Sequence, residues 1–242
     1  MYQIKLGMQV VGNSLIPLSF QLSKEVHGLI VGESGSGKSY LVKYVFSSLL
    51  KYQDDIEIFC MDFKNSGDYE FMDSDHLSVG KDCIEMLDRF YRRYMEIKEK
   101  NLSDKIICVF DEYAAFITWL TNYDKKIAKQ AMDQVSEILM MGRRIGNNGG
   151  AYMWTVLQRP DASYFGTARE NYFIKIVMGN VSRSIRTMLE IDEDDLPKSH
   201  VAKTGHGIAI IGDEIHSFIV PRFDEKRMNA MLKAKRKRSL KA

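Results

Sequence analysis

The chain has few cysteines and no long apolar run, and each of these features excludes a class of protein. Its three cysteines, Cys60, Cys83 and Cys108, are odd in number and scattered, so we expect buried reduced thiols and no disulfide framework. Neither they nor the five dispersed histidines suggest a metal site. No apolar stretch reaches the ~18 residues of a membrane span, and the first residues lack the apolar core of a secretion signal. We therefore expect a cytoplasmic protein with no membrane insertion of its own.

Net charge is also low, at +2, but it is unevenly distributed. From Arg222 onward nine basic residues face only Asp224 and Glu225, a net charge of +7, which leaves about −5 for the first 221 residues. We therefore predict a globular domain over residues 1–225 and a basic tail over 226–242. Such a tail either holds nucleic-acid phosphates or is a solvated, disordered end, and charge alone leaves both possibilities open.

Residues 32–39 form a complete G-x-x-x-x-G-K-S phosphate-binding loop. The apolar run at 28–31 predicts a buried parallel strand before it, and the periodicity of 40–50 predicts a helix after it, which is the context that the motif requires. In such loops backbone N–H groups hold the α- and β-phosphates, the lysine reaches the β- and γ-oxygens, and the serine hydroxyl holds Mg²⁺. We expect nucleotide contacts from Gly32, Glu33, Ser34, Gly35, Ser36, Gly37, Lys38, Ser39 and Tyr40, with Ser39 as a metal ligand.

Strands and helices alternate beyond the loop, which predicts one α/β domain with a mainly parallel sheet flanked by helices. The length of 242 residues and the 45% hydrophobic content suit a single domain of this class. We expect further strands at 56–61, 105–110 and 151–157, and helices at about 82–100 and 126–141.

The strand expected at 105–110 ends in Asp111 and Glu112. An acidic pair after a strand is often a helix N-terminal cap, but the phosphate loop upstream favours catalysis here. In that interpretation Asp111 accepts hydrogen bonds from the water shell of Mg²⁺, and Glu112 polarises the water that attacks the γ-phosphorus. A glutamate beside the aspartate favours hydrolysis over phosphotransfer to a metabolite.

Two further polar positions surround the last of these strands. A turn-rich loop before it holds Arg143, and the strand itself ends at Gln158. A polar residue at the tip of the strand next to the acidic one can contact the γ-phosphate and report its loss. We therefore predict a sensor role for Gln158.

Together these motifs resemble the FtsK/HerA superfamily of ring-forming DNA motors, and the FtsK-type translocases in particular. The resemblance runs nearly end to end, and both order and spacing agree. It rests on Leu6-Gly7 with Gly12, His27, residues 32–39, Asp62-Phe63-Lys64, Asp111-Glu112, Gly142-Arg143 with Gly146, Gln158-Arg159-Pro160, Asn171, and residues 184–189.

The resemblance implies a hexameric RecA-like ring that uses ATP to thread double-stranded DNA. It also implies an arginine that reaches the γ-phosphate of the neighbouring subunit. Arg143 matches the family's arginine in the loop before the sensor strand, and Arg186 lies in its later arginine block. We favour Arg143 because a glycine-rich loop can extend; either arginine could instead contact a surface or the DNA backbone.

The chain also departs from the larger chromosomal relatives. We expect no membrane anchor, no long linker and no winged-helix module after about Phe223, and Phe63 stands where many relatives have proline. A short motor of this type resembles those of plasmids, transposons, integrative elements or phages. We interpret the chain as an ATP-driven DNA translocase for transfer or replication of a mobile element, with element-specific partner proteins. Two alternatives stay open: a genome-packaging or secretion motor of the same superfamily, and a nucleotide-gated DNA-binding module.

Overall fold

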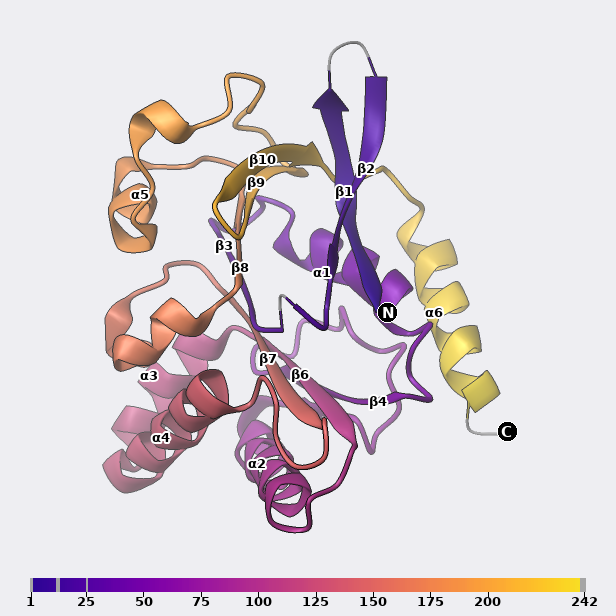
Figure 1. Cartoon of the computed structure of the whole chain (residues 1–242), viewed down its shortest axis with the longest axis vertical. Coiled ribbons are helices and arrows are strands. Elements are labelled where there is room, and N and C mark those ends of the chain that lie inside the picture. The colour runs from indigo at the N-terminus through magenta and orange to yellow at the C-terminus, as the bar shows by residue number, and fades with distance from the viewer. Residues whose placement is uncertain (1, 12–13, 25, 240–242) are drawn as a thin grey trace.

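The structure, a computed structural model, describes residues 2–11, 14–24 and 26–239 and is organised around one ten-stranded sheet (Figure 1). The strand order is β2-β1-β10-β9-β8-β3-β7-β6-β4-β5. Six strands are parallel: β8 (Ile174–Met178), β3 (Gly28–Gly32), β7 (Gly150–Leu157), β6 (Lys105–Asp111), β4 (Ile56–Asp62) and β5 (Leu77–Val79). Two antiparallel hairpins extend the sheet: β1 (Gln3–Val11) with β2 (Ser14–Gln21), and β9 (His206–Ile211) with β10 (Glu214–Ile219).

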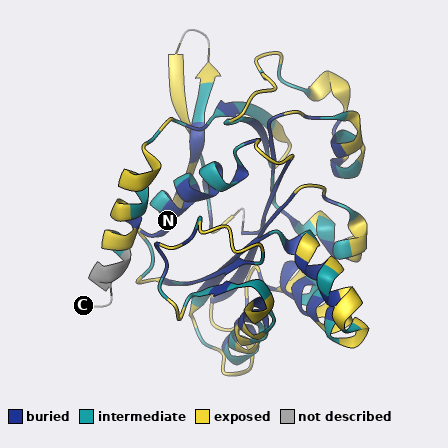
Figure 2. Ribbon diagram, turned by 180° about the vertical axis from the view of Figure 1, so that it is seen from behind, coloured by how far each residue is buried: buried dark blue, intermediate teal, exposed yellow. Residues whose placement is uncertain are grey.

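Helices cover both faces of the parallel strands. On one face lie α1 (Lys38–Leu49) and α6 (Glu225–Ser239); on the other lie α2 (Cys83–Glu99), α3 (Tyr113–Tyr123), α4 (Lys125–Met141) and α5 (Arg183–Leu189). Short 3-10 turns are η1 (Gly80–Asp82), η2 (Ala162–Tyr164), η3 (Gly166–Asn171) and η4 (Glu193–Asp195). Because both faces are covered, strands such as β7 are buried at every position, and their sequences are almost continuously apolar (Figure 2).

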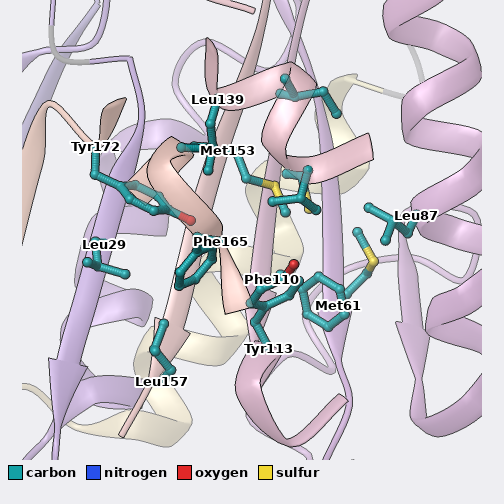
Figure 3. Close-up of a cluster of buried hydrophobic side chains, with 14 of the residues drawn as sticks. Leu29, Met61, Leu87, Phe110, Tyr113, Leu139, Met153, Leu157, Phe165 and Tyr172 are labelled. Carbon is teal, nitrogen blue, oxygen red and sulfur yellow. The ribbon is translucent and has the colours of Figure 1, made fainter. Parts of the chain in front are cut away.

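The core is therefore divided into two parts by the sheet. Side chains alternate along β3, so that Leu29 and Val31 face the α2–α5 side and Ile30 faces α1. Figure 3 shows the first part, in which Leu29 and Leu157 from the sheet lie near the aromatic rings of Phe165 and Tyr172. These two apolar layers fix the positions of the strands, whose ends form the site described below.

The α/β class, the mainly parallel sheet and the flanking helices are confirmed. The expected strands and helices are present with bounds within two residues of those predicted. Strands β5 and β8, helices α3 and α5 and the two antiparallel hairpins were not predicted. All three cysteines are buried and free, as expected. In the described ranges no helix is both long and apolar enough to cross a bilayer.

The basic segment forms helix α6, not the unstructured end that was one of the two alternatives. Its Leu232 is fully buried, and the Lys235 ammonium donates to the carbonyl oxygen of Ser47 on α1 at 3.0 Å. The boundary expected between residues 225 and 226 falls in the first turn of this helix. Gly12 and Lys241 lie outside the described residues, as do the side chains of residues 236–239.

Candidate nucleotide-binding site

The carboxyl ends of four neighbouring parallel strands meet at one edge of the sheet, where open α/β sheets bind ligands. The phosphate loop follows β3, Asp62 ends β4, Asp111 ends β6, and Gln158 follows β7. The strand register brings these ends level, because Asp62 lies opposite Asp111 and Asp111 lies opposite Val156. Motifs that are far apart in the sequence therefore converge on one edge.

The phosphate loop has the backbone shape that its glycines permit. Gly35 and Gly37 have φ angles of 78° and 99°, in the left-handed region that other residues rarely adopt. Gly37 is also the N-cap of α1, so the helix begins directly from the loop. This arrangement directs the N-terminal end of α1, with its partial positive charge, at the space enclosed by the loop.

Lys38 is buried beneath the loop. Its Nζ donates to the carbonyl oxygens of Gly32 at 2.6 Å and Glu33 at 3.0 Å. Burial lowers the pKa of Lys38, and the attraction of Glu112 and Asp111 opposes that effect. A phosphate would offer the ammonium charged oxygens in place of neutral carbonyls, which makes stronger hydrogen bonds.

The segment directly before β9 donates two hydrogen bonds to the backbone of the phosphate loop. The Thr204 hydroxyl donates to the carbonyl oxygen of Gly35 at 3.0 Å, and the Gly205 N–H donates to that of Ser36 at 3.0 Å. A Cβ atom on Gly37 would lie only 3.0 Å from the Gly205 nitrogen, so the two segments are in close contact. The sequence motifs gave no signal for this contact, because it joins residues ~170 positions apart.

Asp111 is buried among hydrogen-bond donors and other carboxylates. Its Oδ2 accepts from the Tyr69 hydroxyl at 2.8 Å, and its Oδ1 accepts from the Glu112 N–H at 3.0 Å. The pKa of Asp111 is raised to about 6, chiefly by burial; the Tyr69 hydrogen bond opposes the rise, and the charges of Glu112 and Asp62 add to it. Asp111, with its raised pKa and the negative charges of two nearby carboxylates, lies in an environment that a cation would stabilise.

Glu112 occupies an unusual backbone conformation at the start of α3. Its φ and ψ angles of 57° and 39° are left-handed, and its side chain makes no capping hydrogen bond. The capping interpretation of the acidic pair is therefore not supported at this residue. A non-glycine residue in this conformation costs about 1–2 kcal/mol, and such outliers concentrate at functional sites.

The oxygen atoms at this edge fit a magnesium ion that is shared with a bound phosphate. Ser39 supplies a hydroxyl and Asp111 a carboxylate, and the buried Asp62 Oδ1 has no hydrogen-bond partner among the described residues. Within the same ranges no group of three or more His, Cys, Asp or Glu side chains could by itself hold a metal. Mg²⁺ commonly binds in this way, through one or two carboxylates plus substrate phosphates and water.

A cavity of about 330 Å³ connects these elements. It is lined by Ser34, Gly35, Gly37, Lys38, Ser39, Tyr40, Lys64, Ser66, Asp68, Asp111, Glu112 and Glu225. A larger hollow of about 630 Å³ lies between α2, α3 and α4 and contains none of the predicted site residues. The smaller cavity is lined by Lys38, Asp111 and Glu112. Because it brings an ammonium group and two carboxylates together, we identify it as the candidate site despite its smaller volume.

A buried lysine joins three elements around this cavity. Lys43, one turn along α1, is 3% exposed, and its ammonium contacts Asp68 at 2.7 Å and Glu225 at 2.6 Å. Asp68 lies in the loop after β4, and Glu225 begins α6. Sequence reasoning missed this group, because lysine in a helix is ordinarily a surface residue.

The three remaining predicted residues lie in different places. Gln158 is exposed directly after β7, whose last residue, Leu157, lies opposite Val31, the residue that precedes the phosphate loop. Arg186 lies on α5 after β8, also at the carboxyl edge, and forms an ion pair with Glu193 at 2.9 Å. Gln158 therefore lies between the phosphate loop and the acidic strand, as a γ-phosphate sensor requires.

Arg143 lies at the opposite, amino edge of the sheet. Its guanidinium is 4.8 Å from the ring centroid of Phe173, which precedes β8. The surrounding loop is closed by backbone hydrogen bonds and packs against the end of α2: a Cβ on Gly146 would lie 2.5 Å from the carbonyl oxygen of Leu102. The glycines of this loop thus serve close packing, and its composition is no reason to expect extension.

The fold and the site define an α/β protein of P-loop architecture with an acidic pair beside the loop. Residues 2–77 match the sequence model of the FtsK/SpoIIIE family. The chain is also 28% identical over 249 residues to the Ftsk domain-containing protein YdcQ of Bacillus subtilis (strain 168), a match that covers 91% of this chain and 49% of YdcQ. It therefore spans about half the length of that relative.

Solved structures share the fold. The pCW3 conjugation coupling protein TcpA, in a monomer form with ATPgS, has a TM-score of 0.68 at 21% identity, covering 97% of this chain and 70% of TcpA. The cytoplasmic domain of the Thermomonospora curvata Type VII Secretion ATPase EccC has a TM-score of 0.65 at 18% identity, covering 97% of this chain and 31% of that domain. The family-model match and the YdcQ relative agree with the resemblance to FtsK-type proteins that the motifs predicted.

Proposed function

We propose that this chain is the ATP-hydrolysing motor of a DNA translocase that acts in the transfer or replication of a mobile element. The observation that carries the proposal is that Lys38 and Glu112 line one cavity, with Asp111 between the loop and α3. A phosphate-binding cation facing a positioned carboxylate is the arrangement that γ-phosphate hydrolysis requires.

Each residue would have a distinct part in hydrolysis. The loop N–H groups and Lys38 hold the phosphate chain, and Lys38 neutralises charge that develops on the γ-phosphoryl oxygens. Glu112 orients the attacking water and accepts its proton, while Gln158 contacts the γ-phosphate from the next strand. Ser39 and Asp111 would hold Mg²⁺, which draws charge from the phosphate oxygens when bound.

The proposal that the chain moves DNA is supported by its similarity to known proteins and by the positive charge on α6. The matched family model is FtsK/SpoIIIE, and one structural neighbour is a conjugation coupling protein. Helix α6 presents exposed basic side chains, among them Lys226, Arg227 and Lys233. Assembly into a ring, with an arginine completing the neighbour's site, is part of the same proposal.

The decisive experiment measures ATP hydrolysis with and without linear duplex, circular duplex and single-stranded DNA, together with the mass of the complex in each condition. We expect duplex DNA to stimulate hydrolysis and to favour a larger assembly. Hydrolysis that is slow and indifferent to DNA would indicate a nucleotide-gated binding module. Rapid hydrolysis that ignores DNA would favour a secretion motor.

The chemistry is tested separately by Glu112→Gln, which keeps the size of the side chain but removes the base. ATP binding should stay near normal, while hydrolysis falls by about 10²-fold or more. Lys38→Ala should instead weaken nucleotide binding, so the two variants should separate in a binding assay. Hydrolysis within a fewfold of the unmodified protein would remove Glu112 from the role of base.

A further inference from the structure

An aromatic pair from the two ends of the chain stands beside the phosphate loop. Tyr40 follows Ser39 in the first turn of α1, and Phe223 directly precedes α6. Their rings are stacked, with centroids 3.8 Å apart and planes inclined by 6°. The Tyr40 hydroxyl also donates to the Phe223 carbonyl oxygen at 3.1 Å and accepts a hydrogen bond from the Phe223 N–H. The backbone and ring of Phe223 are thus both fixed against Tyr40.

The pair is held in place from the neighbouring turn of the helix. Lys43, buried at 3% exposure, joins Glu225 of α6 to Asp68 beyond β4. Leu232, farther along α6, is fully buried against the same side of the sheet as α1. The segment that carries Phe223 is therefore fastened on both sides of the ring pair, as a preorganised binding surface requires.

Tyr40 lines the cavity that contains Lys38 and the acidic pair. Among the described residues lining that cavity it is the single aromatic side chain; the others are glycines or polar and charged residues. The phosphate chain of a nucleotide matches the polar lining, whereas its base is the one part with a broad apolar face. Complementarity therefore places the base against the aromatic part of the wall.

We propose that the Tyr40–Phe223 pair is the platform on which the base of the bound nucleoside triphosphate stacks. The proposal rests on the proposed function, since it presupposes that the loop binds the phosphates. It makes the segment before α6 part of the nucleotide site, so the site is completed by residues from both ends of the chain. Stacking recognises a ring face and is worth about five- to a hundredfold in affinity per base.

The test compares two ligands that share phosphates but differ in the base. Dissociation constants are measured by calorimetry, with Mg²⁺, for a non-hydrolysable ATP analogue and for inorganic tripolyphosphate. The unmodified chain should bind the ATP analogue about five- to a hundredfold more tightly. Tyr40→Ala should bring the two constants close together by weakening the analogue alone, whereas Tyr40→Phe, which keeps the ring, should preserve the difference.

Two further variants guard against a purely structural effect. Phe223→Ala, which leaves α1 unchanged, should also reduce the preference for the analogue. Tyr44→Ala removes the same side chain one turn along α1, outside the lining of the cavity, and should leave the preference intact. Thermal unfolding of each variant reports whether the fold is retained, and Phe223→Ala decides the matter if Tyr40→Ala does not fold.

The outcomes separate this proposal from the function on which it rests. If the unmodified chain binds both ligands equally well, or if Tyr40→Ala weakens both equally, the platform is refuted while the phosphate site stands. If the unmodified chain binds neither ligand, the nucleotide site itself is refuted, and the platform with it. A loss confined to the analogue in Tyr40→Ala and Phe223→Ala supports the platform.

Discussion

A buried histidine beneath the central strand should make the stability of this fold depend on pH. His27 precedes β3 and is 0% exposed. Its Nδ1 accepts the Met153 N–H at 3.0 Å, which requires an unprotonated Nδ1, and its Nε2 has no hydrogen-bond partner among the described residues. Burial, and then the nearby positive charge of Arg143, lower the pKa of His27 from 6.5 to about 3.

The sign and size of the effect follow from this shift. Between pH 6.5 and 3 the unfolded chain binds a proton at His27 that the folded chain does not, so folding stability falls as the pH falls. The loss is about 1.4 kcal/mol per pH unit below 6.5, hence about 2 kcal/mol at pH 5. A folded pKa of about 4 would give nearly the same loss at pH 5, because the folded state would still be almost unprotonated there.

The assay is urea unfolding of the full chain at pH 7.5 and pH 5, compared with His27→Gln. Glutamine cannot titrate, so the unmodified chain should lose about 2 kcal/mol more than this variant between the two pH values. Other titrating groups cancel in the comparison. His216→Gln, on the partly exposed β10, keeps His27 and should retain the full loss. An excess loss below about 0.5 kcal/mol in the unmodified chain would show that His27 is protonated at little cost, and the reasoning would fail.

Two other predictions concern assembly and DNA. Arg143→Ala and Arg186→Ala should each keep ATP binding, but the variant that lacks the trans-acting arginine should lose DNA-stimulated hydrolysis. Mixing that variant with Lys38→Ala subunits should restore part of the hydrolysis, because each subunit then supplies what the other lacks. If neither arginine variant regains hydrolysis in such a mixture, the result counts against trans action. Replacing the exposed basic residues of α6 by glutamine should reduce the slope of log Kd for DNA against log salt concentration by up to about three units. Hydrolysis without DNA should not change. An unchanged slope would place the DNA contacts elsewhere. The residues to replace are Lys226, Arg227 and Lys233.

Features that depend on local sequence were predictable, and those that depend on distant contacts were not. The strand, loop and helix around Lys38 follow from periodicity and glycine placement, and parallel strands bring Asp62 and Asp111 to the same edge without further information. The Tyr40–Phe223 stack joins residues 183 positions apart, and although the phosphate-loop motif marks Tyr40, no local pattern marks Phe223 as its partner. The same is true of Glu225, whose charge was counted with the basic segment but which contacts Lys43.

Helix α6 shows how a charge count misjudges a segment whose other face is apolar. A count of basic residues treats each one as free to contact phosphate. The Lys235 ammonium, however, donates a hydrogen bond to the carbonyl oxygen of Ser47, and burial lowers the pKa of Lys235. The backbone carbonyl of Lys235 also accepts from Gln53 at 2.8 Å. Deleting everything from residue 233 onward would therefore remove contacts to α1 together with the charges. A fall in DNA affinity after such a deletion could not be assigned to charge, so single substitutions of exposed residues test the DNA hypothesis more directly than truncation does.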